Sequence, residues 1–136
     1  MTVITDLIHN SKSVVAVGVQ AVSTAGDVTG EIIDTQGFYA GLLQLALGST
    51  ASSKVKVKSF QQSDNSDMSN AEDIPESNLF GLAIGKDIDT LKSVGCINFV
   101  PTKRYVRAVV TTTTNGAVIG ANAVLFGADV AGKVLE

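Results

Sequence analysis

The chain has 136 residues, a formal net charge of −3 at pH 7 and only 17% charged residues. This length is typical of one domain with a single core, so residues 1–136 are expected to form one domain rather than two. The negative charge argues against nucleic acid as a main partner, and a single cysteine excludes an internal disulfide. Because charge is scarce, either copies of the chain or another protein cover part of the surface, or the protein is a small monomer rich in alanine and threonine.

Two long uncharged stretches, 35–53 and 108–128, approach the length of a membrane span. Glycines interrupt the first stretch and a predicted turn interrupts the second, so neither is expected to cross a membrane. The apolar run 14–22 is not expected to be a signal peptide, since Asp6 precedes it and Gly18 interrupts it.

The N-terminal third of the chain predicts an arm followed by three strands. Residues 1–12 form the arm, and the first strand is predicted at 13–22, where every second residue from Val15 onward is valine or alanine. Residues 23–27 are predicted to form a loop, and a short strand is predicted at 31–34. The apolar run Phe38–Leu47 fits a buried strand or a helix equally well by periodicity. Its length and its flanking glycines favour a strand that is buried on both faces.

The middle of the chain predicts one strand and one long loop. Lysines and valines alternate in 54–61, so Val55 and Val57 are expected to point inward, and the break in this pattern at 59–60 predicts a β-bulge. The polar stretch 63–76 is expected to be a loop.

The last part of the chain predicts four more strands, two of them at 79–84 and 90–99. The other two flank Asn115-Gly116, and Asn-Gly between β-prone runs is typical of a hairpin with a two-residue type I′ turn. About eight strands with little helix predict an all-β, antiparallel sandwich or barrel. The hairpin register predicts one apolar side made of Val106, Ala108, Val110, Ala121, Ala123 and Leu125, and an opposite side made of Tyr105, Arg107, Thr111, Thr113, Gly120 and Asn122.

No catalytic constellation is recognisable, and the chain is not expected to be an enzyme. The only histidine, His9, lies in the arm, and Cys96 lies within a predicted strand, where cysteine is usually a small buried hydrophobe. Too few nitrogen and sulfur ligands are present for a zinc site. No cofactor and no metal is therefore expected.

The loop at 63–76 supplies several carboxylates, but its spacing does not fit a calcium-binding loop at Ser66 and Met68. It is expected to be an exposed, solvated loop that displays Asp64, Asp67, Glu72 and Asp73.

A candidate partner interface lies at the start of the predicted hairpin. Arg104 and Arg107 flank Tyr105, and such arginines can grip a carboxylate on another protein. The predicted register places Tyr105 and Arg107 on the same outward face as Phe126. These four residues are predicted to anchor a partner or, alternatively, to be ordinary surface residues.

The order of the segments from residue 61 to the predicted hairpin resembles that of a known group of proteins. Gln-Gln-Ser-Asp-Asn-Ser-Asp at 61–67 precedes a polar loop, a glycine-containing strand approaches Pro101, and Lys-Arg-Tyr-Val-Arg at 103–107 leads into the threonine-rich hairpin. Over about residues 13–126, this order resembles small virion proteins of tailed bacteriophages. Among these it resembles the jelly-roll cement, or capsid decoration, proteins.

The resemblance implies a non-catalytic jelly-roll subunit that binds the outside of an HK97-type capsid and secures the seams between capsomers. Its partner would be the major capsid protein, and it would form a homo-oligomer, a dimer or a trimer. The protein would be made in the bacterial cytoplasm and end in the virion. Two alternatives stay open: another phage structural subunit, from the tail or the head–tail adaptor, and a small ligand-binding β protein.

The arm 1–12 and the C-terminal tail 127–136 lie outside the resemblance, and both are predicted to become ordered only in the oligomer or on a capsid. Limited proteolysis of the dilute protein should therefore trim both ends, as measured by mass spectrometry of the fragments, and assembly should protect them. Resistance of both ends in dilute monomer would contradict this prediction.

Overall fold

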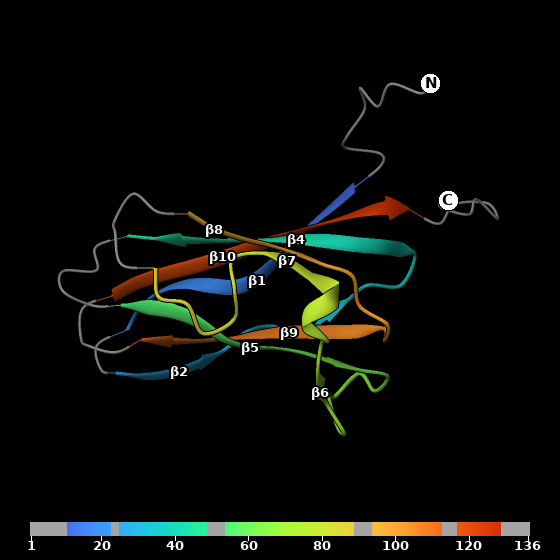
Figure 1. The fold of residues 1–136 in the computed structure, drawn as a ribbon, viewed down its shortest axis with the longest axis horizontal. Coiled ribbons are helices and arrows are strands. Elements are labelled where there is room, and N and C mark those ends of the chain that lie inside the picture. Colours follow the sequence, from blue (N-terminus) through green and yellow to red (C-terminus); the bar gives the residue numbers. More distant parts are fainter. Residues whose placement is uncertain (1–10, 23–24, 49–53, 89–93, 113–116, 129–136) are drawn as a thin grey trace.

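The computed structural model describes residues 11–22, 25–48, 54–88, 94–112 and 117–128. These residues fold into two antiparallel β-sheets that lie face to face (Figure 1). The strands are β1 (Ser11–Val22), β2 (Gly26–Thr29), β3 (Ile33–Asp34), β4 (Phe38–Leu47), β5 (Val55–Ser63), β6 (Glu72–Asp73), β7 (Leu79–Gly81), β8 (Val94–Phe99), β9 (Tyr105–Thr112) and β10 (Ala117–Ala128), and a short 3-10 helix, η1 (Glu76–Asn78), precedes β7.

Each sheet joins strands that are far apart in the chain. The first sheet has the order β1-β10-β4-β8-β7, and the second has the order β2-β9-β5-β6, with β3 also paired to β9. If β2 and β3 are counted as two parts of one strand and β7 as an added edge strand, this is the strand order of a jelly roll. The all-β antiparallel sandwich predicted from the sequence is therefore confirmed.

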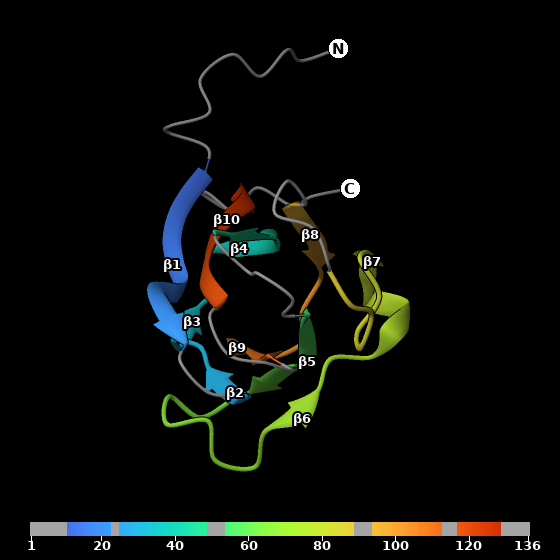
Figure 2. The same ribbon diagram turned by 90° about the vertical axis from the view of Figure 1, so that its left-hand side faces the viewer.

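Backbone hydrogen bonds also join the two sheets along both edges of the sandwich. At one edge, the Glu31 N–H donates to the Ala16 carbonyl oxygen over 2.7 Å, and this bond ties β1 to the link between β2 and β3. At the other edge, Val55 and Ile88 exchange two backbone hydrogen bonds, which tie β5 to the segment that follows β7. Figure 2 shows the two layers end-on. Strand β1 lies beside β3 at one edge of the sandwich, and β8 lies above β5 at the other edge.

The core lies between the sheets and takes alternate residues from each strand. Phe60 of β5 and Phe99 of β8 are both fully buried, and their ring centroids are 4.7 Å apart. The two central strands, β9 and β10, contribute inward side chains that are all buried in the same cluster: Val106, Ala108, Val110, Ala121, Ala123 and Leu125.

The predicted hairpin between the last two strands is wrong. β9 pairs with β5, β2 and β3, whereas β10 pairs with β1 and β4, so β9 and β10 belong to opposite sheets. The Asn115-Gly116 turn lies outside the described residues. The six residues of the predicted apolar side are nevertheless all buried. Alternation identifies the side of a strand that faces the core, but it does not identify the neighbouring strand, and these residues meet across the core instead of side by side.

Strand β4 has the predicted bounds, but the expectation that it is buried on both faces is wrong. Leu43 and Leu45 are buried, whereas Gln44 is partly exposed and Ala46 is exposed. The second sheet covers only one face of β4, so its other face lies on the molecular surface.

Two further differences come from pairing that local patterns do not reveal. Strand β2 lies where the sequence indicates a loop, because Gly26–Thr29 pair with the edge of β9. Strand β7 ends at Gly81, whose φ of 106° is incompatible with a continued strand, rather than at residue 84. The predicted irregularity in β5 is confirmed as a register shift between Val57 and Ser59.

Close packing against Phe99 gives a test of the core. A Cβ atom on Gly41 would overlap the Phe99 ring, which has no free space to move into because it is fully buried. Gly41→Ala should therefore lower the free energy of unfolding by about 1–3 kcal/mol through overpacking. Urea unfolding measures this loss. Gly18→Ala is the matched control, since no atom lies within 4 Å of the added methyl group, and an equal loss in both variants would contradict the packing argument.

Candidate functional site

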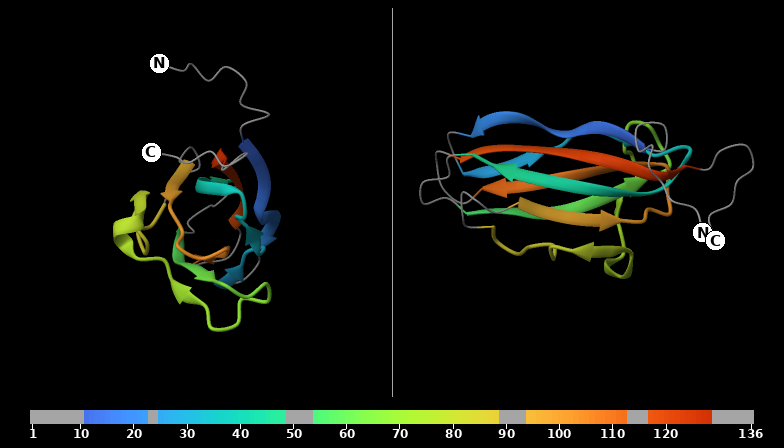
Figure 3. Two further views of the ribbon diagram at one scale, coloured as in Figure 1. Left: turned by 90° about the vertical axis from the view of Figure 1, so that its right-hand side faces the viewer. Right: turned by 90° about the horizontal axis from the view of Figure 1, so that it is seen from above.

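The outer face of the first sheet, called here the uncharged face, has no charged side chain among the described residues. Pairing across the sheet aligns its outward residues in rows, and Figure 3 shows the strands side by side from above. Lys12 does not interrupt this face, because it is aligned with the inward Leu125 and its charge acts on Asp34 of the opposite sheet. The rows are Ser11, Phe126 and Ala40; Ser13, Val124, Leu42, Asn98 and Phe80; Val15, Asn122, Gln44 and Cys96; and Val19, Gly120 and Ala46.

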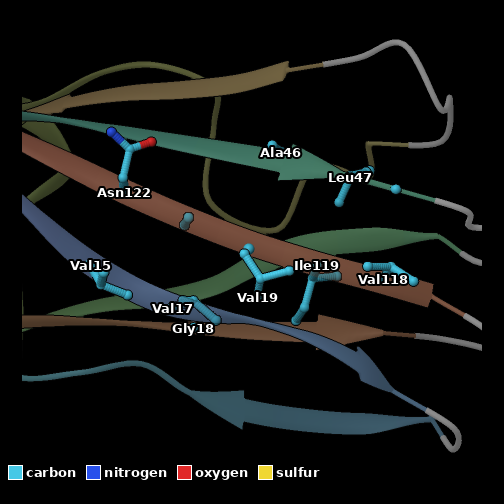
Figure 4. Close-up of a pocket in the computed structure, with 12 residues that line it drawn as sticks. Val15, Val17, Gly18, Val19, Ala46, Leu47, Val118, Ile119 and Asn122 are labelled. Atoms are coloured by element: carbon cyan, nitrogen blue, oxygen red, sulfur yellow. The ribbon is translucent and has the colours of Figure 1, made fainter.

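A groove of about 480 Å³ runs along this face over β10 (Figure 4). Its walls are formed by Val15 and Val19 of β1 on one side and by Ala46 of β4 on the other. Gly120 forms part of the floor, and its missing side chain leaves room for Val19, because a Cβ at this position would lie 2.8 Å from a Val19 methyl group. The valines of the wall are unusually exposed: Val19 is 85% exposed and Val15 is 59% exposed.

The far side of the uncharged face contains further side chains that ordinarily avoid water. Phe80 is 54% exposed, and Cys96 lies half-buried beside Gln44. The Asn98 Oδ1 atom is buried and has no hydrogen-bond partner within the described part of the chain. Exposed apolar side chains that gather on one uncharged face of a small protein usually mark a contact with another molecule.

The outer face of the second sheet is charged. Lys58 of β5 forms an ion pair with Asp27 of β2 at 2.7 Å, and the Thr111 hydroxyl of β9 donates to the same carboxylate. The hydrogen bond from Lys58 is the main reason that the pKa of Asp27 lies below its ordinary value. The two faces of the sandwich therefore differ sharply in polarity.

A cluster of fixed polar side chains, called here the arginine cluster, lies at one end of the second sheet. The Arg104 Nε and Nη2 atoms donate to the two Asp34 carboxylate oxygens over 2.9 and 2.8 Å. The guanidinium carbon lies 5.0 Å from the centroid of the Tyr105 ring, a cation–π arrangement. Arg107 Nε donates to Gln61 Oε1 over 2.9 Å. Each side chain of the cluster is thus held in one orientation by a partner within the chain.

The structure brings together three of the four residues predicted as a partner interface. Arg104, Tyr105 and Arg107 lie in the arginine cluster, but Phe126 lies on the uncharged face of the opposite sheet. The expected shared face is wrong for Phe126 because it depended on pairing between β9 and β10. A role of the other three in binding stays a prediction.

The residues predicted to be displayed by the acidic loop, Asp64, Asp67, Glu72 and Asp73, are all exposed. Glu72 and Asp73 form the short strand β6, so the loop is interrupted there, and Glu72 pairs with Lys103 at 2.5 Å. Asp67 accepts the backbone N–H of Ser69, which lowers the pKa of the Asp67 carboxyl. Among the described residues, no group of three or more His, Cys, Asp or Glu side chains is placed to hold a metal ion. His9 lies outside the described residues.

Sequence reasoning did not identify the uncharged face. The available signal was the lack of charge shared by 13–22 and 117–128. The two segments form one surface only because the first strand pairs with the last.

No known protein family matches the chain, and no curated protein matches it. Among solved structures, the chain is similar to the SPBc2 prophage-derived protein YomS, with 16% sequence identity and a TM-score of 0.49 over 85% of this chain and 92% of that chain. At this level the likeness carries no conclusion about what the present chain does. The described residues include no helix that is long and apolar enough to cross a membrane.

The ion pair between Asp34 and Arg104 predicts a pH-dependent contribution to stability. Hydrogen bonds from Arg104 are the main cause that lowers the pKa of Asp34 from 3.8 to about 2. A lowered pKa in the folded state stabilises the protein above pH 3.8, and this stabilisation is lost as the pH falls toward 2. Asp34→Asn should therefore lower the free energy of unfolding by about 1 kcal/mol or less near neutral pH, since the pair is partly exposed. The loss should shrink below pH 3.8 and disappear as the pH falls through 2.

Urea unfolding of Asp34→Asn, Arg104→Gln and the double variant between pH 2 and pH 7 measures this effect. The double-mutant cycle isolates the interaction between the two side chains. If the free energies of unfolding of the native protein and of Asp34→Asn differ by the same amount at every pH, the ion pair does not make this pH-dependent contribution.

Proposed function

We propose that this chain is a non-catalytic structural protein of a tailed-phage virion that binds the outside of an HK97-type capsid. The observation that carries the role within an assembly is the uncharged face, with the exposed Val15 and Val19 beside the groove. Such a surface suits a subunit that works within an assembly, because apolar side chains gain free energy when another protein covers them. The phage capsid as the place of assembly is supported by the resemblance of residues 13–126 to cement proteins.

The arginine cluster is the surface that we assign to the major capsid protein. Arginine and tyrosine are enriched among the residues that dominate binding energy at interfaces. Arg104 and Arg107 are each held by a neighbour in the chain, so they lose less conformational freedom on binding than unrestrained side chains would. The guanidinium of Arg107 also suits a carboxylate on a partner.

In this proposal the chain stabilises the capsid through many equivalent contacts. Each contact is modest, but a subunit that touches two capsomers, or that is joined to a second subunit on the neighbouring capsomer, must release several contacts before the seam opens. Linked contacts of this kind raise the total strength well above that of each single contact.

Co-sedimentation with phage heads tests the proposal. The purified protein is mixed with intact and with emptied heads of a candidate HK97-type phage and then pelleted, and saturable binding at one simple ratio to the major capsid subunit is expected. Arg107→Ala should weaken binding about tenfold or more if this side chain anchors the contact. Lys86→Ala is the matched control, because it also removes one positive charge but lies in the exposed turn after β7.

Absence of binding to either kind of head would contradict the capsid role. If the isolated protein instead forms rings, as seen by electron microscopy, the tail or head–tail adaptor alternative gains support. If Arg107→Ala binds the heads as tightly as the native protein does, the capsid role stands, but Arg107 is excluded as an anchor of the contact with the major capsid protein.

A further inference from the structure

We infer that the uncharged face binds the same face of a second copy of the chain, in a two-fold symmetric dimer of sandwiches. The inference deepens the proposed function, because it assigns a partner to the face that carries that proposal. It does not require capsid binding, since the dimer would form in the isolated protein.

The face has the size that a stable dimer needs. The face is formed by four strands, β1, β10, β4 and β8. Neighbouring strands are about 4.8 Å apart, and a strand averages about ten residues of 3.3 Å each, so the face measures roughly 19 Å by 33 Å, or on the order of 600 Å². Two such faces bury about 1,200 Å² when they meet, which is the lower end of the range for specific interfaces. Val15 and Val19 lie along one edge of this area, on β1, next to the groove over β10.

The face also has the shape that a two-fold contact needs. In such a contact the same surface occurs on both sides, so every protrusion must find a hollow on an identical surface. Val15 and Val19 protrude along β1, and the groove over Gly120 lies directly beside them (Figure 4). The exposed valines of one copy therefore have an apolar groove of the same kind to meet on the other copy.

Charge favours a second copy over an unrelated partner. The chain carries a formal charge of −3, so two copies that met through a charged surface would face like charges. The uncharged face is the part of the described surface where copies meet without this repulsion. It also offers no charged group that would select a partner of opposite sign, whereas the arginine cluster does. We therefore assign the uncharged face to self-association and the arginine cluster to the capsid.

Mass measurement by size-exclusion chromatography with light scattering, over a range of protein concentrations, tests the inference. The native chain has a mass of 14.0 kDa, and the dimer should have twice that mass. The double variant Val15→Lys/Val19→Lys puts two charges into the interface and should remain a monomer at concentrations where the native protein is a dimer. The matched control Thr29→Lys/Ile32→Lys adds the same charges at exposed positions outside the uncharged face and should still dimerise.

Cys96 provides a second readout without any new label. It is the only cysteine and lies half-buried on the uncharged face. Its reaction rate with a thiol reagent should fall in proportion to the remaining fraction of monomer as the native protein is concentrated. The rate should not depend on concentration in Val15→Lys/Val19→Lys.

Circular dichroism and thermal unfolding establish that each variant is folded. If the valine variant does not fold, Asn122→Lys takes its place, because Asn122 is exposed at the centre of the same face. A monomeric native protein at every soluble concentration, a trimer or ring, or a dimer that survives these substitutions would overturn the inference. Failure to bind phage heads would not, since that result concerns only the proposed function.

Discussion

The structure depends on the packing of its two sheets around one shared core, with β9 in one sheet and β10 in the other. Each of the two strands has partners on both sides in its sheet, and each turns alternate apolar residues toward the core. Ala108 of β9 and Ala123 of β10 are both almost completely buried in this core. Once these strands lie in opposite layers, the other strands follow: β1 and β4 flank β10, and β2 and β5 flank β9.

This arrangement divides the surface into two chemically different faces. The first sheet carries valine, alanine, asparagine and glutamine outward, whereas the second sheet carries lysine, aspartate and arginine. Both faces cover the same core, so the needs of folding do not explain the difference between them. A contact with another protein on one face, and with solvent or a polar partner on the other, does explain it.

The polar contacts of the second sheet contribute orientation more than stability. Lys58–Asp27 and Arg104–Asp34 are partly exposed ion pairs, and such pairs typically add little to the free energy of unfolding. Their geometric effect is larger, because Asp34 holds two of the three guanidinium nitrogens of Arg104, whose guanidinium lies over the Tyr105 ring. Preorganised side chains of this kind favour binding by reducing the conformational freedom that is lost in the complex.

The sequence by itself determined the all-β class, most strand positions, the bulge in β5 and the inward side of β9 and β10, because these depend on local alternation of side chains. The tertiary structure alone decided which strands are neighbours. An Asn-Gly turn predicted that β9 and β10 pair, and that error placed Phe126 with Tyr105 on one face and hid the uncharged surface formed by the first and last strands. A period of two residues shows which side chains are buried, but the choice between a neighbour in the same sheet and one across the core depends on contacts between distant segments.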